Sequence, residues 1–273
     1  MSAREAAADA SRRLAAAGVE DARFEAELLA REAAGISRAE YFAGSALDAE
    51  ESARFAAWVT RREQREPAAY ITGHREFYGR DFGVGAGVLV PRPETELLVD
   101  LGVQELDRDP AAIVVEAGTG SGAVAVSIAA ERPAARVIAT EVSGDAMRFA
   151  RANATALAPH TGLVLGDLVT AVSRADVVLA NLPYIPAWEI EALEPEVSRW
   201  EPRVALDGGD DGYALIRRLI EDCATRLRPR LLALEVGFGQ AADVAAILAG
   251  YGLDAWFVKD LAGIDRIVCA RWE

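Results

Sequence analysis

The sequence predicts a doubly wound α/β fold, preceded by a small helical bundle and a hairpin-like linker. Three observations predict it. Short apolar, β-branched runs alternate with helical patterns from residue 111 onward, the first 66 residues carry helix-start and helix-stop signals, and a glycine-rich span separates the two regions. A chain of 273 residues can form one small and one large domain. We therefore expect a helical domain at 1–69, a linker at 70–90 and an α/β domain at 91–273.

The helical domain is predicted from its helix-start and helix-stop signals. Three pairs have the spacing of a helix-start capping box, namely Ser2 with Glu5, Ser37 with Glu40 and Asp48 with Glu51. Helix stops are expected at Gly18, Gly35 and Gly44. The residues expected on the inner faces are Leu14, Phe24, Leu28, Leu29, Phe42, Phe55, Trp58 and Val59. These signals predict a bundle of four or five helices.

The helical domain has two possible roles, a structural appendage or a docking domain for a partner. An arginine cluster is a candidate docking surface, although such a cluster is often only a solvated face; its members are Arg54, Arg61, Arg62 and Arg65. We favour docking, because small helical additions to enzymes often select the substrate.

Two regular patterns follow the bundle. The span from Tyr70 to Gly87 is glycine-rich with alternating apolar residues, which is typical of a hairpin. Pro93 and the acidic residues after it predict a helix start. We expect Arg92 and Glu94, beside that start, at the entrance between the two domains.

The remaining chain alternates strands with helices. The expected strands are Ala111–Glu116, Arg136–Thr140, Gly162–Leu165, Ala175–Ala180, Leu231–Val236, Leu253–Val258 and Arg266–Ala270. The expected helices lie near 122–131, 144–156, 211–228 and 238–250. This order predicts a seven-stranded doubly wound sheet whose last two strands form a closing pair.

Composition excludes several classes of function. The formal net charge is −14, which argues against a general nucleic-acid binder and against a direct nucleic-acid substrate. Residues 1–75 are close to charge balance, so the helical domain suits an acidic partner better than the rest does. The chain has two cysteines, Cys223 and Cys269, and two histidines, too few for a disulfide framework or a metal site. With no apolar run of membrane-spanning length, we expect a cytoplasmic monomer without membrane contact.

A glycine loop follows the first expected strand. Glu116 precedes Gly118-Thr119-Gly120-Ser121-Gly122, which has the spacing Gly-x-Gly-x-Gly rather than the dinucleotide pattern Gly-x-Gly-x-x-Gly. Glu116 would repel a pyrophosphate, whereas it could receive an amino group. The loop therefore predicts a zwitterionic ligand.

Acidic residues end the next two expected strands. Glu141 is placed to accept hydrogen bonds from two ribose hydroxyls, and Asp167 from an adenine amino group. Together with the glycine loop, these residues predict S-adenosylmethionine as cofactor, with NAD a distant second.

The tetrapeptide Asn181-Leu182-Pro183-Tyr184 follows the fourth expected strand. Pro183 holds the chain extended, so that an amide side chain, free carbonyls and an aromatic ring converge. Such groups can grip a planar NH2 by its two hydrogens while a ring packs on the plane. The alternative is a polar turn at a strand end.

The chain resembles the peptide chain release factor N(5)-glutamine methyltransferases over nearly its whole length. The segments that carry the resemblance are Tyr70–Gly73, Glu76–Gly79, Val90–Glu96, Glu201-Pro202, Ala205–Gly209, Asp260–Gly263 and Asp265-Arg266. The resemblance implies a helical domain that helps bind the release factor, a hairpin linker and an S-adenosylmethionine-dependent methyltransferase domain. It further implies methyl transfer to the glutamine of the Gly-Gly-Gln tripeptide of release factors.

The resemblance also assigns the site. Asn181 through Tyr184 hold the substrate glutamine: the Asn181 side-chain oxygen and the Leu182 carbonyl accept from the amide nitrogen, and Tyr184 packs on its plane. The expected cofactor residues are Gly118, Thr119, Gly120, Ser121, Gly122, Glu141, Asp167, Leu168 and Asn181.

Three residues depart from the usual family pattern. Leu182 replaces a proline, Glu116 stands where aspartate is commoner, and Leu168 stands where an aromatic residue often follows the acidic one. Leu182 makes the tetrapeptide similar to that of the adenine dimethyltransferases acting on ribosomal RNA, whose target is also a planar NH2. Methylation of an adenine or of another protein's glutamine therefore stays open, as does a non-catalytic binding module.

Overall fold

The structure, a computed structural model, describes residues 1–272 of the chain. They form two compact units, one of residues 1–74 with 194–200, the other of residues 75–193 with the chain from Glu201 onward. The sequence places its boundaries at 69/70 and 90/91, whereas the first unit extends to His74 and includes a distant segment. Among the described residues, no helix is long and apolar enough to cross a bilayer.

The first unit is helical. Its elements are α1 (Ala3–Ala16), α2 (Ala22–Ala34), α3 (Arg38–Ala43), α4 (Ala49–Glu63), α5 (Ala68–Thr72) and the short η3 (Glu196–Trp200). All three expected capping boxes are present, at Ser2, Ser37 and Asp48. Gly35 and Gly44 end their helices in the left-handed conformation, and Gly18 also has a positive φ. The local helix signals are therefore confirmed.

Two phenylalanines expected inside the bundle lie at its surface. Phe24 and Phe42 are 56% and 50% exposed. Helix α2 buries a face of mostly alanines, from Ala22 through Ala26 to Ala33, and Phe24 lies two positions from Ala22, on the other side of the helix. Phe42 lies under the guanidinium of Arg38, 5.7 Å from the ring centre. Alanines therefore fill much of this core, and Phe24 and Phe42 are left outside, whereas Phe55 and Tyr41 are buried in it.

The expected basic surface of the bundle is wrong for Arg62, whereas Arg54 and Arg61 keep partly exposed side chains. Arg62 is buried and forms ion pairs with Glu25 and with Glu196, the latter at 2.7 Å. Arg65 also pairs with Glu196. The other two members are engaged as well: Arg61 with Glu66, and Arg54 with Glu50 and the Ala33 carbonyl. The arginines hold the unit together because their carboxylate partners lie within it.

The second unit is an α/β domain. Its strands are β1 (His74–Phe77), β2 (Arg80–Gly83), β3 (Ile113–Ala117), β4 (Arg136–Glu141), β5 (Gly162–Leu165), β6 (Val177–Ala180), β7 (Leu231–Glu235), β8 (Ala255–Lys259) and β9 (Asp265–Ala270). Its helices are η1 (Pro93–Thr95), α6 (Glu96–Arg108), α7 (Ala123–Glu131), α8 (Gly144–Leu157), η2 (Ile190–Ala192), η4 (Arg203–Ala205), α9 (Ala214–Asp222), η5 (Cys223–Leu227) and α10 (Ala241–Ala249). All seven sheet strands expected from the sequence are present, with ends shifted by no more than two residues.

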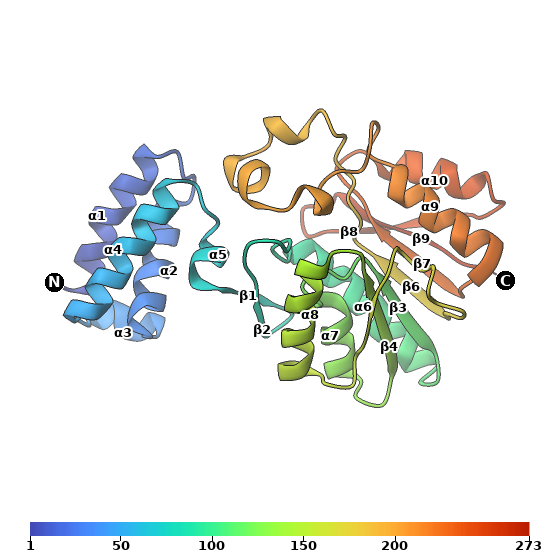
Figure 1. Cartoon of the computed structure of the whole chain (residues 1–273), viewed down its shortest axis with the longest axis horizontal. Coiled ribbons are helices and arrows are strands. Elements are labelled where there is room, and N and C mark those ends of the chain that lie inside the picture. Colours follow the sequence, from blue (N-terminus) through green and yellow to red (C-terminus); the bar gives the residue numbers. More distant parts are fainter. Residues whose placement is uncertain (273) are drawn as a thin grey trace. The chain divides into compact units, whose positions relative to one another are not determined.

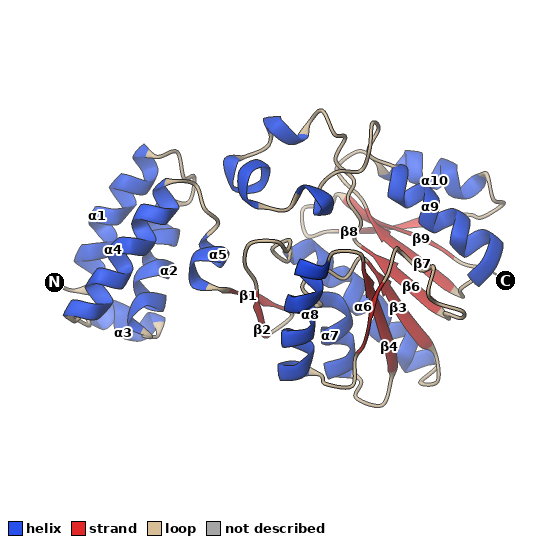
Figure 2. Ribbon diagram, viewed as in Figure 1, coloured by secondary structure: helices blue, strands red, loops and turns tan. Residues whose placement is uncertain are grey.

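The seven-stranded sheet has the order β5-β4-β3-β6-β7-β9-β8. Strands β3 to β7 pair in parallel, while β9 pairs antiparallel to β7 and to β8. Figures 1 and 2 show helices α6, α7 and α8 on one face of this sheet and α9 and α10 on the other. The order reverses between β3 and β6, which is where ligands bind in open α/β sheets.

The β1–β2 hairpin belongs to the core beneath the sheet. Phe77 and Phe82 are fully buried and meet edge to face with ring centres 5.9 Å apart. They pack in one cluster with Leu98 of α6 and Val124 of α7. The middle of the glycine-rich span, from His74 to Gly83, is thus a hairpin as expected, whereas its start at Tyr70 lies in helix α5.

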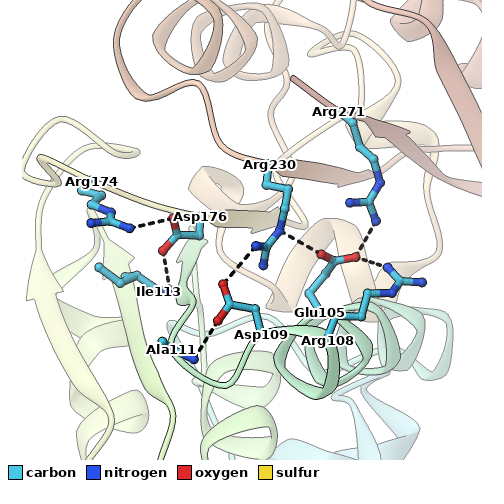
Figure 3. Close-up of polar contacts among 9 residues, drawn as sticks. All are labelled: Glu105, Arg108, Asp109, Ala111, Ile113, Arg174, Asp176, Arg230 and Arg271. Atoms are coloured by element: carbon cyan, nitrogen blue, oxygen red, sulfur yellow. Dashed lines mark hydrogen bonds and ion pairs between the residues drawn. The ribbon is translucent and has the colours of Figure 1, made fainter. Parts of the chain in front are cut away.

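Charged side chains close the amino-end edge of the sheet. Glu105 of α6 is buried and receives Arg108, Arg230 and Arg271, which come from α6, the residue before β7 and the residue after β9 (Figure 3). Asp176, just before β6, accepts from the Ile113 backbone N–H at 2.8 Å. These ion pairs join segments that are far apart in the sequence, at the edge away from the glycine loop.

Candidate active site

The strand register brings the expected site residues to one edge of the sheet. Ala117 of β3 pairs with Thr140 of β4 and with Ala180 of β6, and Ala180 pairs with Leu234 of β7. The residues that follow these four positions are Gly118, Glu141, Asn181 and Glu235. Parallel strands end at the same edge, so the glycine loop, two carboxylates and the tetrapeptide begin side by side.

The glycine loop is held by Glu141. Its Oε2 accepts from the Gly120 backbone N–H at 2.8 Å, and its Oε1 accepts from the Ser143 N–H at 2.8 Å. Gly118, Gly120 and Gly122 all have positive φ, which side chains other than glycine rarely adopt. Each carboxylate oxygen can accept a second hydrogen bond, so Glu141 can still receive ribose hydroxyls.

Glu116 lies beneath the loop. It is buried, and its Oε2 accepts from the Thr119 hydroxyl and, at 2.9 Å, from the Ala125 N–H. Burial raises the pKa of Glu116 to about 8, against the lowering effect of these two donors. A nearby cation would favour the charged form, so this carboxyl suits a ligand that carries an amino group.

Asp167 and Leu168 follow β5. Leu168 is buried with φ +45°, and Asp167 Oδ2 accepts from Arg218 of α9 at 2.5 Å. The sequence predicts Asp167 as a partner of an adenine amino group, without any role for Arg218. The ion pair occupies Oδ2 of Asp167. Oδ1 is the oxygen that can accept from an adenine amino group, as the sequence predicts.

The tetrapeptide is fixed at both ends. Asn181 Nδ2 donates to the Thr95 hydroxyl at 3.0 Å, and Thr95 donates to Glu235 at 2.7 Å. The Tyr184 carbonyl accepts from Gln240 Nε2 at 2.9 Å. Burial raises the pKa of the Tyr184 phenol to about 12, so its ring stays neutral.

An ion pair joins the partly exposed Arg92 to the buried Glu201. Arg92 donates to Glu201 at 2.6 Å, and the other oxygen of Glu201 accepts from the Val90 N–H at 3.3 Å. Burial raises the pKa of Glu201, while Arg92 opposes that shift. The pair therefore holds the chain from Val90 to Arg92 in place.

These features surround one cleft of about 390 Å3. Its lining includes every expected site residue except Gly122 and Tyr184, and adds residues that the sequence did not indicate. The lining residues used below are Thr95, Glu116, Gly118, Glu141, Asn181 and Leu182. The described residues contain no group of histidine, cysteine and acidic side chains that could hold a metal ion. The glycine loop and the tetrapeptide therefore face a common space large enough for an organic ligand.

Sequence reasoning missed two residues of this edge. Thr95 lies within a segment that carries the family resemblance, but the sequence pattern assigns it no role. The pattern around Glu235 predicts only the end of a buried strand. A buried acidic residue at the carboxyl end of a strand is the signal that could have drawn attention to Glu235.

Residues 5–73 match the model of the PrmC N-terminal domain, and residues 94–192 match that of the methyltransferase small domain. Relatives named release factor glutamine methyltransferase match almost end to end. The one from Cereibacter sphaeroides is 43% identical, over 97% of this chain and 98% of the relative. Those from Geobacter sulfurreducens and Moorella thermoacetica are each 40% identical, over 94% and 99% of this chain and 92% and 98% of theirs.

The chain belongs to the release factor glutamine methyltransferase family. The resemblance found in the sequence is thereby confirmed, as is the methyltransferase fold. Solved structures share the fold of this release factor glutamine methyltransferase family member at low identity. The hMettl16 catalytic domain in complex with the MAT2A 3'UTR hairpin 6 is 16% identical, with TM-score 0.58 over 82% of this chain and 81% of that one. A methyltransferase from Pyrococcus furiosus is 18% identical, with TM-score 0.51 over 71% of this chain and 89% of that one.

Proposed function

We propose that this protein transfers a methyl group from S-adenosylmethionine to the side-chain amide nitrogen of the glutamine in the Gly-Gly-Gln tripeptide of release factors. The observation that carries the proposal is the position of Asn181. It lies in one cleft with the loop residues Gly118 to Ser121, at the point where the strand order reverses. The near full-length relatives supply the substrate class.

The cofactor end of the cleft fits S-adenosylmethionine. Glycines with positive φ allow close approach of the backbone, Glu141 offers acceptors for ribose hydroxyls, and Glu116 offers a partner for the amino group. The remaining residues proposed for this end are Thr119, Gly120, Ser121, Gly122, Asp167, Leu168 and Asn181. When bound, the cofactor supplies an electrophilic methyl group on a sulfonium.

The tetrapeptide holds the methyl acceptor. An amide nitrogen is a poor nucleophile because its lone pair is delocalised into the carbonyl. Two acceptors, the Asn181 side-chain oxygen and the Leu182 carbonyl, accept hydrogen bonds from the two N–H groups of the glutamine amide. These hydrogen bonds favour a pyramidal nitrogen. Pro183 keeps this stretch extended, and Tyr184 packs on the amide plane. Positioning and electrostatics then supply most of the rate, and the proton leaves after transfer.

The helical unit binds the release factor. Residues 5–73 match a family model of their own, which supports a role tied to this family rather than to methyl transfer in general. The protein acts as a cytoplasmic monomer in this proposal.

Mass spectrometry of an unmethylated release factor, incubated with S-adenosylmethionine and the protein, tests the proposal. We expect one added methyl on the Gly-Gly-Gln glutamine, and none with Asn181→Ala. Cofactor binding of the variant, measured by calorimetry, separates a lost methyl acceptor site from a lost cofactor site. Label on ribosomal RNA or on another protein, with the release factor unmodified, would overturn the proposal in favour of an adenine or another glutamine.

A further inference from the structure

Three side chains form a hydrogen-bonded chain behind the methyl acceptor site. Asn181 follows β6, Thr95 ends η1 and Glu235 ends β7, so three separate segments supply them. Asn181 Nδ2 lies 3.0 Å from Thr95 Oγ1, which lies 2.7 Å from Glu235 Oε2. Thr95 and Glu235 are 6% and 2% exposed, so water does not compete for their hydrogen bonds.

The number of available protons sets the direction of this chain. A hydroxyl has one hydrogen to donate, and an ionised carboxylate can only accept. Thr95 therefore donates to Glu235 and accepts from Asn181, which requires the NH2 end of the Asn181 amide to face Thr95. The two ends of an asparagine amide have nearly the same shape, so a hydrogen-bond network decides which way it points.

We propose that Thr95 and Glu235 are positioning residues that turn the Asn181 amide so that its oxygen faces the methyl acceptor. This inference rests on the proposed function, because that function requires an acceptor at Asn181 Oδ1. In this role both residues act through Asn181 rather than directly on the substrate.

The donors and acceptors of the hydrogen-bonded chain exchange roles when Glu235 gains a proton. A protonated Glu235 can donate to Thr95, which then donates to Asn181 Oδ1 and turns the NH2 end toward the acceptor. Burial raises the pKa of Glu235 to about 7, while Thr95, Arg266 and Arg92 lower it and Glu94 raises it. Arg266 of β9 is itself held by Asp260 and the Val236 carbonyl. At saturating cofactor, kcat should therefore rise with pH through about 7.

Threonine variants test the positioning role. Thr95→Val keeps the shape and removes the hydroxyl, so we expect kcat to fall about 10-fold to 100-fold, with little change in cofactor affinity. Thr95→Ser restores the hydroxyl and should recover most of the rate. The matched control is Thr161→Val, which removes another buried hydroxyl. The Thr161 hydroxyl donates to the Ala158 carbonyl at 2.8 Å, and neither residue lines the cleft. Equal losses in the valine and serine variants would overturn the proposal, because packing alone would then explain them.

Glu235→Gln tests the proton argument. A neutral amide can donate to Thr95 or accept from it, so kcat should fall and its rise through about pH 7 should disappear. Glu105→Gln, a change at another buried glutamate at the opposite edge of the sheet, is the control and should keep the rise. A rise that persists in Glu235→Gln would contradict the assignment.

Hydrogen exchange of the Asn181 side-chain amide tests the positioning role without measuring turnover. In the side-chain amide NMR spectrum of the full chain with cofactor, the Asn181 signals are identified by their loss in Asn181→Ala. One Asn181 proton should exchange slowly in the wild type and Thr95→Ser, and fast in Thr95→Val. Identical exchange in all three overturns the positioning role whether or not the release factor is methylated. A failure of wild-type methylation alone would instead refute the proposed function.

Discussion

Leu182 packs against Gly118, so that a Cβ atom on Gly118 would lie 3.0 Å from Leu182 Cδ2. This contact joins the tetrapeptide after β6 to the glycine loop after β3. Leu182 is buried, and Gly118 has φ +74°. The residue that replaces the usual family proline thus takes part in shaping the cofactor loop.

Gly118→Ala should weaken cofactor binding at least about tenfold, for two reasons. Alanine is strained at this positive φ, and its methyl group would crowd the Leu182 side chain. Calorimetric titration with S-adenosylmethionine measures this. Gly252→Ala is the matched control, since Gly252 has φ +75° and open space around its Cβ position. It should lose stability without losing affinity, and an equal loss of affinity in both variants would contradict the role of the contact.

Gln240 links Tyr184 to Gly237 through the two ends of its amide. Its Oε1 accepts from the Gly237 N–H at 2.8 Å, while Nε2 donates to the Tyr184 carbonyl. Gln240→Glu keeps the first bond and removes the second donor, so kcat/KM for the release factor should fall roughly threefold to tenfold. Steady-state kinetics measure this, with Gln64→Glu at the exposed end of α4 as control. An unchanged kcat/KM would mean that the Tyr184 backbone is held by other contacts.

Glu105 should matter for stability and not for catalysis. It is buried under Arg271, Arg230 and Arg108 at the edge of the sheet away from the cleft (Figure 3). Burial alone would raise the pKa of Glu105, but the arginines lower it. Glu105→Gln should reduce the free energy of unfolding by about 1–3 kcal/mol in urea, since the half-exposed arginines regain water. Arg108→Ala, at a more exposed guanidinium, should cost less than about 1 kcal/mol.

The stability of the protein without cofactor should fall as the pH rises. Burial raises the pKa of Glu116 from 4.5 to about 8 and that of Glu235 to about 7. Between the ordinary pKa of 4.5 and these raised pKa values, the folded chain binds more protons than the unfolded chain. The free energy of unfolding therefore decreases with pH over this range. Glu105 and Asp176, whose pKa values are lowered, are already ionised in both states above about pH 5.5.

Urea unfolding at pH 5.5 and 8.5 checks this prediction. The wild type should be less stable at pH 8.5, and Glu116→Gln should show a smaller difference between the two values. The exposed Glu20→Gln serves as control and should follow the wild type. A wild-type stability that stays level or increases over this range would contradict the burial of neutral carboxyls.

Local patterns were sufficient for the helix starts of the first unit and for the strands of the seven-stranded sheet. Capping boxes at Ser2, Ser37 and Asp48 involve residues three apart, so the sequence alone predicts them. The seven sheet strands are short apolar runs bounded by polar turns. The glycine loop and Asn181 follow directly from strand ends, and strand order then brings them together.

Only the tertiary structure decided which distant groups meet. Thr95 and Glu235 are separated by 140 residues, and Thr95 and Asn181 by 86, so no local pattern links them. Arg62 reads as a surface charge on α4 until Glu25 and Glu196 are seen to enclose it. The physical reason is the same in each case. Hydrogen bonding and burial depend on distance in space, whereas sequence patterns report only neighbours along one helix or strand.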